Sequence, residues 1–208
     1  MRSFALLGLI LMGGLVMQGQ DASAATSTTK TDKTDKTKPA ATTKTGEDVA
    51  VLQTSMGTIV FRFFDKDAPK HVANFKKLAG EGFYNGTTFH RVIPGFMIQG
   101  GDPNSKDADR SNDGTGGSGT NIPAEFNANK HLRGTVSMAR SNDPNSASSQ
   151  FFICVKPAEF LDGKYSVFGQ VIEGMDVVDK IVSVPRDQKD NPIDKVVIEK
   201  ATIEKRKV

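Results

Sequence analysis

The feature that most constrains how this chain folds is a series of short apolar segments separated by turns. In residues 58–64 large apolar side chains occupy every second position, which is the repeat of a β-strand. A similar segment at 49–54 lies on the other side of Ser55-Met56-Gly57, so we predict a β-hairpin. Further strands are expected near residues 96–100, 134–140, 151–155, 167–172 and 194–204.

Only two segments have the spacing of a helix. We expect one helix to begin near Pro69, with Asp67 as its N-cap, because apolar residues then recur at helical spacing as far as Leu78. A second, shorter helix is expected after Gly174. Many short strands with only two helices favour a mainly β fold in which one sheet closes on itself.

The first 24 residues have the pattern of a secretory signal peptide. Arg2 supplies a positive charge, an apolar run continues to Met17, and Ala22-Ser23-Ala24 matches a cleavage site. The run is shorter than the about 20 residues of a spanning helix, so no stable membrane insertion is expected. We predict export, to the periplasm if the source is a Gram-negative bacterium. An uncleaved signal that tethers the protein to the membrane is the alternative.

Residues 25–46 are mostly Thr, Lys, Ala, Asp and Pro and lack the apolar content that folding needs. We predict a disordered Thr/Lys-rich linker here, followed by a folded domain at 47–208; a charged tail with its own function is the alternative. The whole chain has 27 Lys and Arg against 24 Asp and Glu. These charges are dispersed rather than gathered in one basic patch, so no nucleic-acid partner is expected.

The run from Phe89 to Gly101, FHRVIPGFMIQGG, indicates a small binding pocket. Two apolar segments flank Pro94-Gly95, a pair typical of a tight turn because proline fixes φ and glycine accepts positive φ. The turn brings together four side chains that make a small apolar pocket with polar groups at its rim: Arg91, Phe96, Met97 and Gln99. Such a pocket suits an uncharged residue whose neighbouring carbonyl accepts a hydrogen bond.

This run resembles the signature of the cyclophilin-type peptidyl-prolyl cis–trans isomerases. The resemblance continues in residues 134–140 (GTVSMAR), 149–154 (SQFFIC) and 160–169 (FLDGKYSVFG), and it extends over about residues 47–205. It implies an eight-stranded antiparallel closed β-barrel capped by two α-helices, and together with the predicted signal peptide it leads us to expect a bacterial, exported member. The resemblance also implies proline-containing polypeptide substrates, with no cofactor and no metal. We expect a monomer that accelerates the folding of exported proteins.

Isomerisation of an X–Pro bond breaks no σ bond, because its barrier is amide resonance of about 18–20 kcal/mol. By match to the catalytic arginine of the family, Arg91 is expected to bond the lone pair that the prolyl nitrogen regains in the twisted state. The alternative interpretation of Arg91 is a surface residue in a salt bridge.

The other site residues follow from the same match. Four apolar residues match the proline pocket, although any one of them alone fits an ordinary core: Phe96, Met97, Phe152 and Leu161. Four more match positions that bond the substrate backbone or hold the arginine: Gln99, Gln150, Ala139 and Arg140. His90 is expected to shape the rim without titrating in catalysis, because the reaction transfers no proton.

Two positions depart from the best-known eukaryotic pattern. Phe160 stands where many members have Trp, and Tyr165 stands where many have His. Both residues keep an aromatic body, so proline binding is expected to survive, but loss of the indole N–H removes a hydrogen-bond donor. We therefore expect weak binding of cyclosporin, the cyclic peptide inhibitor of the family, with isomerase activity retained.

Other motifs favour no other chemistry. The G-x-G-x-x-G that begins at Gly114 lies in a polar loop without the strand and helix of a dinucleotide site. Cys154, the only cysteine, lies in an apolar run and is expected to be a buried, inert thiol. The three histidines lack the spacing of a metal site. No Ser-His-Asp arrangement stands out, although the sequence leaves open one that forms in three dimensions.

Two functions remain open at this point. The first is the isomerase, and the second is a proline-peptide-binding chaperone or adaptor without essential turnover. Retention of Arg91 favours the enzyme, because a binding module need not keep it. A barrel without a peptide site would leave Arg91, Gln99 and Gln150 together without a reason.

Overall fold

The computed structural model describes residues 46–207, so the predicted signal peptide at 1–24 and all but the last residue of the predicted linker lie outside the described residues. Within that range the strands are β1 (Glu47–Thr54), β2 (Gly57–Phe63), β3 (Arg91–Ile93), β4 (Met97–Gly100), β5 (Thr135–Met138), β6 (Phe151–Cys154), β7 (Val167–Glu173) and β8 (Ile198–Arg206). The helices are α1 (Pro69–Gly80) and α2 (Met175–Val182), with short 3₁₀ turns at Pro103–Lys106, Arg110–Asn112 and Glu159–Leu161.

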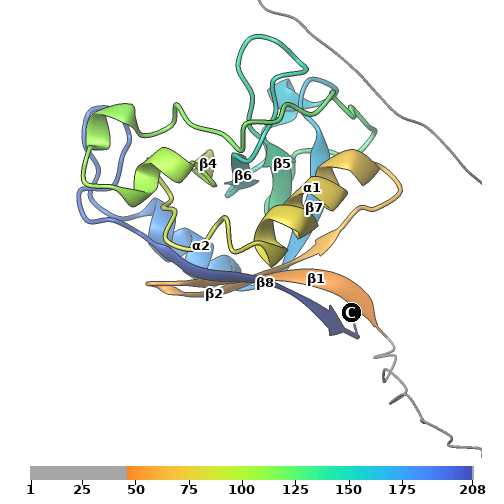
Figure 1. Cartoon of the computed structure of the whole chain (residues 1–208), viewed down its shortest axis with the longest axis horizontal. Coiled ribbons are helices and arrows are strands. Elements are labelled where there is room, and N and C mark those ends of the chain that lie inside the picture. Colours follow the sequence, from red (N-terminus) through yellow and green to blue (C-terminus); the bar gives the residue numbers. More distant parts are fainter. Residues whose placement is uncertain (1–45, 208) are drawn as a thin grey trace, which may run out of the picture. The chain divides into compact units, whose positions relative to one another are not determined.

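The eight strands form one antiparallel sheet in the order β3-β4-β6-β5-β7-β2-β1-β8. Figure 1 shows this sheet curled around the core, with the chain end at β8 beside the start of β1. The predicted hairpin is confirmed as β1 and β2, in which Thr54 pairs with Gly57. The eight-stranded, mainly β fold with two helices is therefore as predicted.

Closure of the barrel is only partial, which corrects the expectation of a fully closed one. The end strands β3 and β8 do not pair along their length. The segment before β3 is joined to the start of β8 by the bridge from Thr88 to Val197, with the Phe89 N–H donating to the Val196 carbonyl at 2.9 Å and the Ile198 N–H to the Thr87 carbonyl at 2.7 Å. The free edge of β3 is instead occupied by a loop, because the Val92 N–H donates to the Asp190 carbonyl at 2.8 Å. The last strand also begins later than the expected 194, at Ile198.

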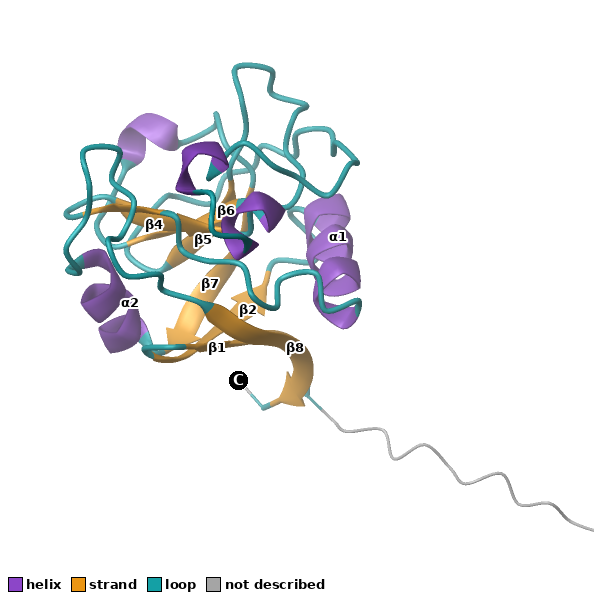
Figure 2. Cartoon of the chain, turned by 60° about the vertical axis from the view of Figure 1, so that its left-hand side comes forward, coloured by secondary structure: helices purple, strands orange, loops and turns teal. Residues whose placement is uncertain are grey.

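The core lies inside the curl of the sheet and is rich in aromatic rings. Phe75 of α1 contacts Phe61, Tyr84 and Phe151, with ring centroids 4.7 to 5.5 Å apart. In Figure 2 the helices α1 and α2 flank the strands. Because aromatic residues bury large apolar areas, this cluster joins the helix to both halves of the sheet.

The two predicted helices are confirmed, but the predicted cap of α1 is wrong. Its N-cap is Ala68, which has no side chain to accept a hydrogen bond, and the Asp67 carboxylate accepts from Asn129 Nδ2 at 2.9 Å instead. The Glu125 carboxylate takes over the capping role from outside the helix. It accepts from the backbone N–H groups of Lys70 and His71 at 3.1 and 3.0 Å, and it lies 2.7 Å from His71 Nδ1.

Replacement of Glu125 by alanine tests this cap. The Glu125→Ala variant leaves two helix N–H groups without acceptors and the fully buried His71 ring without its partner. We expect a loss of about 2 kcal/mol in the free energy of unfolding, measured by urea denaturation. Glu81→Ala, which removes an exposed pair with Lys77 at the other end of α1, should cost less than about 0.5 kcal/mol. Equal losses in both variants would contradict the capping role.

Candidate active site

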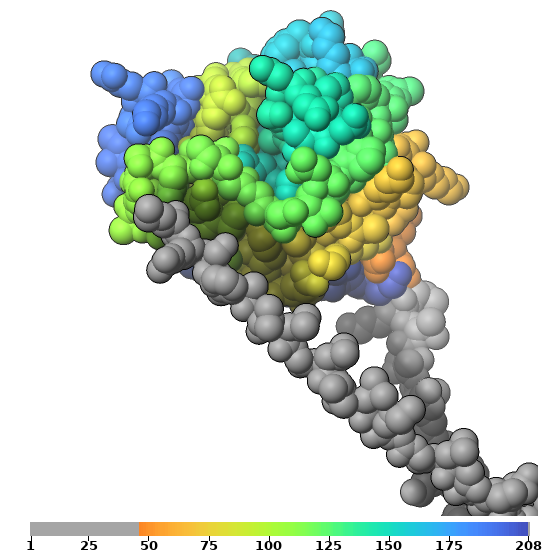
Figure 3. All heavy atoms as spheres, turned by 45° about the horizontal axis from the view of Figure 1, so that its top comes forward, coloured from red at the N-terminus to blue at the C-terminus, as the bar shows by residue number. Residues whose placement is uncertain are grey.

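Ten of the twelve predicted site residues line one hollow of about 330 Å³. They are Arg91, Phe96, Met97, Gln99, Ala139, Arg140, Phe152, Phe160, Leu161 and Tyr165. Gln150 lines an adjoining hollow of about 240 Å³, which shares Gln99, Ala139 and Arg140 with the first. Figure 3 shows this face of the molecule, hollowed between the green loop after β4 and the teal segment before β6.

Strand register places the central residues of the hollow. Arg91 of β3 pairs with Gln99 of β4, which pairs with Phe152 of β6. Directly opposed residues of antiparallel strands project from the same face, so these three side chains form one row. The turn between β3 and β4 uses Gly95 at φ +78°, which confirms the role expected of the Pro-Gly pair.

The floor of the hollow is a small apolar cluster separate from the main core. It contains Met97, Phe152, Cys154, Ala158 and Leu161, all buried. The intervening residues of β4 and β6, Ile98 and Ile153, face the main core instead. Strand alternation therefore gives β4 and β6 two apolar faces, and the predicted proline-pocket residues belong to the one that opens on the hollow.

Phe160 forms the outer rim. It is 63 % exposed, the largest exposed fraction of any large apolar residue in the described range, and its ring centroid lies 5.4 Å from that of Phe96. Tyr165 lies deeper, with the guanidinium of Arg140 4.5 Å from its ring centroid. The same guanidinium donates to the Lys164 and Ser141 carbonyls at 3.0 and 2.8 Å, so Arg140 holds together two loops of the rim.

Arg91 is exposed at the mouth of the hollow. Across residues 46–207 its side chain takes part in no hydrogen bond and no ion pair, so the salt-bridge alternative finds no partner there. Its neighbour Gln99 is fixed, because Gln99 Nε2 donates to Gln150 Oε1 at 2.8 Å. Gln150 Nε2 in turn donates to the carbonyls of Gly114 and Gly116 at 2.9 and 2.8 Å. The N–H donors of the Arg91 guanidinium are therefore available to bind a ligand, next to the Gln99 amide that Gln150 holds in place.

His90 lies behind this row rather than in the hollow. Its ring is only 4 % exposed, it lies against Gly114, and neither ring nitrogen has a hydrogen-bond partner among residues 46–207. Burial lowers its pKa below the usual histidine value. His90 also borders a third hollow, of about 250 Å³, together with Arg91 and Arg110. A neutral imidazole therefore supports the wall next to Arg91.

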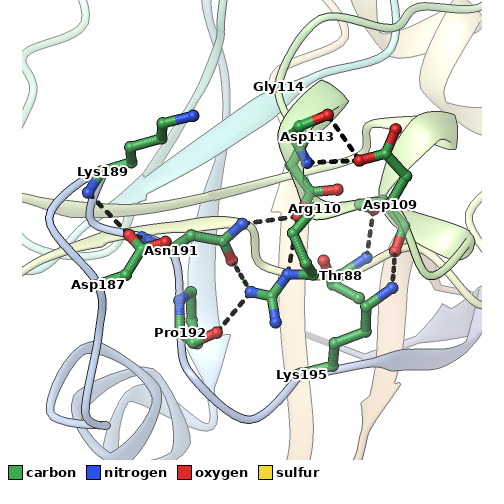
Figure 4. Close-up of polar contacts among 12 residues, drawn as sticks. Thr88, Asp109, Arg110, Asp113, Gly114, Asp187, Lys189, Asn191, Pro192 and Lys195 are labelled. Carbon is green, nitrogen blue, oxygen red and sulfur yellow. Dashed lines mark hydrogen bonds and ion pairs between the residues drawn. The ribbon is translucent and has the colours of Figure 1, made fainter.

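A group of polar contacts around Arg110, which we call the polar staple, holds the loop after β4 in place. The sequence did not predict these contacts. Arg110 donates to the Asn191 side chain and to the Pro192 carbonyl, and it pairs with Asp113 at 3.2 Å. Figure 4 shows these contacts joining two loops that are 81 residues apart in the chain. Since Gly114 follows Asp113 directly and its carbonyl binds Gln150, the staple fixes one side of the adjoining hollow. No local sequence pattern pairs Arg110 with Asn191.

Other reactive groups are absent or inert in the part of the chain that the structure covers. Cys154 is fully buried, and burial raises the pKa of its thiol to about 12, which confirms the predicted inert thiol. Residues 46–207 contain no cluster of three or more His, Cys, Asp or Glu side chains able to hold a metal ion. Among the same residues, no helix has the length and apolar character needed to cross a membrane.

Comparison with known proteins identifies the family. The family model described as cyclophilin type peptidyl-prolyl cis-trans isomerase/CLD matches residues 49–203. The chain belongs to this family. A probable peptidyl-prolyl cis-trans isomerase of Brucella abortus is 51 % identical over 140 residues, covering 65 % of this chain and 71 % of the relative. A peptidyl-prolyl cis-trans isomerase of Synechococcus elongatus is 50 % identical over 143 residues, covering 65 % of this chain and 93 % of the relative.

A solved structure agrees with the fold. The cyclophilin-type isomerase of Cryptosporidium parvum, crystallised in the presence of the dipeptide Ala-Pro, is 34 % identical and superposes with a TM-score of 0.70. The match covers 76 % of this chain and 99 % of that protein. Family membership, the names of the relatives and this fold identify the chain as a cyclophilin-type peptidyl-prolyl cis–trans isomerase.

Proposed function

We propose that this cyclophilin accelerates the folding of exported proteins by rotating X–Pro bonds, with Arg91 as its catalytic residue. The observation that carries the proposal is a guanidinium with no partner in residues 46–207, placed at the mouth of an apolar hollow. A proline ring is apolar and carries no N–H, so the cluster around Met97, Phe152 and Leu161 suits it.

The mechanism follows from the electronic change in the amide. The planar amide resists rotation because the nitrogen lone pair is delocalised into the carbonyl. In the twisted state that lone pair returns to nitrogen and accepts a hydrogen bond that the planar state cannot accept. A donor fixed at this point stabilises the twisted state more than the planar one, which lowers the barrier. An acceleration of about 10⁵-fold requires about 7 kcal/mol of such differential stabilisation.

Arginine suits this task better than other donors. Its guanidinium stays charged at every working pH and presents its N–H groups in a fixed plane. The apolar floor excludes water from one side of the site, which strengthens the hydrogen bond. Gln99 and Gln150 act as positioning residues, because their linked amides border the hollow next to Arg91. No group needs to gain or lose a proton, so the buried, neutral His90 has no catalytic proton to supply.

The substrate residues next to the proline can lie in the adjoining hollow, on the other side of Gln99. The adjoining hollow is lined by polar groups of Thr115, Ser146 and Ser148, and it opens into the proline hollow at Ala139 and Arg140. We expect the substrate backbone to extend through it as a strand beside residues 139 and 140. The cellular setting rests on the sequence of residues 1–24, which predicts export to the periplasm or, if the signal is not cleaved, a membrane-tethered protein.

Replacement of Arg91 by alanine tests the catalytic assignment. The Arg91→Ala variant loses the only donor assigned to the prolyl nitrogen. We expect kcat/KM for an Ala-Pro peptide to fall about 10²- to 10³-fold, measured by a protease-coupled assay. Arg62→Ala is the matched control, because Arg62 is an exposed arginine on β2 that lines none of the hollows at the site; its kcat/KM should stay at the wild-type value.

A wild-type protein no faster than buffer would overturn the enzyme proposal. It would leave a proline-peptide-binding chaperone or adaptor as the account to test. An Arg91→Ala variant with full activity would keep the enzyme but remove Arg91 from its mechanism.

Cyclosporin binding tests the consequence of Phe160. We propose that cyclosporin binds weakly because the rim ring lacks an N–H donor. Phe160→Trp restores that donor at a 63 % exposed position, so we expect affinity to rise about three- to tenfold, measured by titration calorimetry. Leu132→Trp, at a 52 % exposed position outside the hollows, should leave affinity unchanged. No gain in Phe160→Trp would refute this explanation of weak binding.

A further inference from the structure

Behind the proline hollow, three side chains form a continuous hydrogen-bonded chain. His131 Nδ1 lies 3.0 Å from Asp162 Oδ1, and His131 Nε2 lies 3.1 Å from Ser137 Oγ. The backbone N–H of His131 also donates to Asp162 Oδ1 at 2.9 Å. His131 is 1 % exposed and Ser137 is fully buried. The sequence left open such an arrangement in three dimensions, and the fold assembles it from β5 and two loops.

Ser137, His131 and Asp162 are the residue types of a hydrolase triad, but the serine is not accessible to a substrate. Ser137 belongs to β5, where all four residues are buried, and its hydroxyl is within 3.0 Å of the Ser166 carbonyl. A nucleophilic serine has to meet its substrate, so a sealed hydroxyl excludes acyl transfer. The three hydrogen-bonded side chains therefore have a structural role.

His131 supports the wall of the proline hollow. The His131 ring lies nearly parallel to Phe152, with centroids 6.0 Å apart and planes at 13°. It also meets Tyr165 edge to face at 6.4 Å and 85°. Phe152 and Tyr165 contact each other edge to face at 5.9 Å. Both of these rings line the hollow, so His131 fixes two of its walls from behind.

The anchors of His131 lie on the elements that carry the other walls. Asp162 directly follows Leu161 and belongs to the same loop as Tyr165. Ser137 pairs with Phe152 across β5 and β6. It therefore continues the row that begins at Arg91 and Gln99. A displacement of the imidazole would therefore move both Phe152 on β6 and the loop that carries Leu161 and Tyr165.

The hydrogen bonds of the His131 side chain differ between its neutral and its protonated form. In the neutral ring, Nδ1–H donates to Asp162 and Nε2 accepts from the Ser137 hydroxyl. If Nε2 takes up a proton, it donates to Ser137 Oγ, and the Ser137 hydroxyl turns to the Ser166 carbonyl, which already accepts from the Met138 N–H. Protonation therefore replaces the bond that Ser137 donates to the ring and adds a second donor to the Ser166 carbonyl, so it changes the contacts that hold His131.

We propose that His131, held between Asp162 and Ser137, is a positioning residue that sets the proline hollow for substrate. The inference rests on the proposed isomerase function and adds to it a residue that touches no substrate. The ring acts through Phe152 and Tyr165, so its loss should weaken substrate binding more than the chemical step. Loss of one stacked aromatic contact corresponds to a rise of about five- to tenfold in KM.

The sign of the pH effect follows from the surroundings of the ring. The groups that face the chain are the carboxylate of Asp162, the ammonium of Lys130 paired with it at 3.2 Å, the buried Cys154 thiol and the Tyr165 hydroxyl, with Arg140 beyond the Tyr165 ring. Burial lowers the pKa of His131, and Asp162 opposes that shift. A lowered pKa means that protonation disfavours the native arrangement, so the wall should loosen and KM should rise as pH falls below 6.5.

The first test compares two histidine variants of the full chain. In His131→Gln we expect KM for an Ala-Pro peptide to rise about five- to tenfold with kcat within about twofold of wild type, and the acid rise in KM to disappear. His71→Gln is the matched control, because His71 is also buried against a carboxylate but lines none of the hollows. It should keep the wild-type KM and the acid rise. A His131→Gln variant with wild-type KM and an unchanged pH profile would overturn the proposal.

A second test uses the wild-type protein and does not depend on how a variant folds. The Cε1–H signal of His131 is followed by NMR through a pH titration, with and without saturating Ala-Pro dipeptide. Because coupling between two sites is reciprocal, a dipeptide that prefers the neutral ring must lower the titration midpoint of His131 and leave that of His71 unchanged. Dipeptide binding with no shift of His131 overturns this inference alone. Absence of both dipeptide binding and turnover overturns the proposed function and, with it, the inference.

Discussion

Backbone pairing of β3, β4 and β6 is the constraint on which the rest of the site depends. The ladder sets Arg91 opposite Gln99 and Gln99 opposite Phe152, so a cation, an amide and an apolar ring project side by side from one face. A shift of one residue in β4 would turn Met97 and Gln99 into the main core and Ile98 into the hollow. The strands are short, and β3 and β4 together span only residues 91–100, so the local turn at Gly95 fixes much of the register between them.

Around that ladder, polar contacts from distant parts of the chain keep each group in place. Gln150 joins Gln99 to the carbonyls of the loop after β4, and Arg110 ties that loop to residues 191 and 192. His131 packs against the back of Phe152. Buried polar groups of this kind are costly unless every donor and acceptor is paired, and the paired ones specify a single geometry. Arg91 also lines the hollow, its side chain has no partner in residues 46–207, and the proposed mechanism assigns it to the reacting amide.

The sequence predicted most of the fold and the membership of the hollow, and the reasons are local. Strand alternation and the Pro-Gly turn depend only on residues that are close in the sequence. Ten of the predicted site residues line one hollow. The misses have non-local causes. Asp67 is a reasonable cap by its position, yet Glu125, 55 residues beyond Lys70, supplies the carboxylate. The partial closure depends on the Asp190 carbonyl, and the place of His90 under Gly114 depends on a folded loop. Ser137, His131 and Asp162 meet only because β5 lies beside β6.

In the proposed mechanism, Arg91 acts through the fixed plane of its N–H donors and not through its charge alone. Arg91→Lys keeps the charge but replaces the fork by a mobile ammonium. Two-dimensional NMR exchange spectroscopy of an Ala-Pro peptide, with the full chain and this variant, measures cis–trans exchange and binding in one sample. We expect the peptide signals of this variant still to shift on binding while the exchange cross-peaks are lost. Exchange cross-peaks as strong as those of the wild type would contradict it.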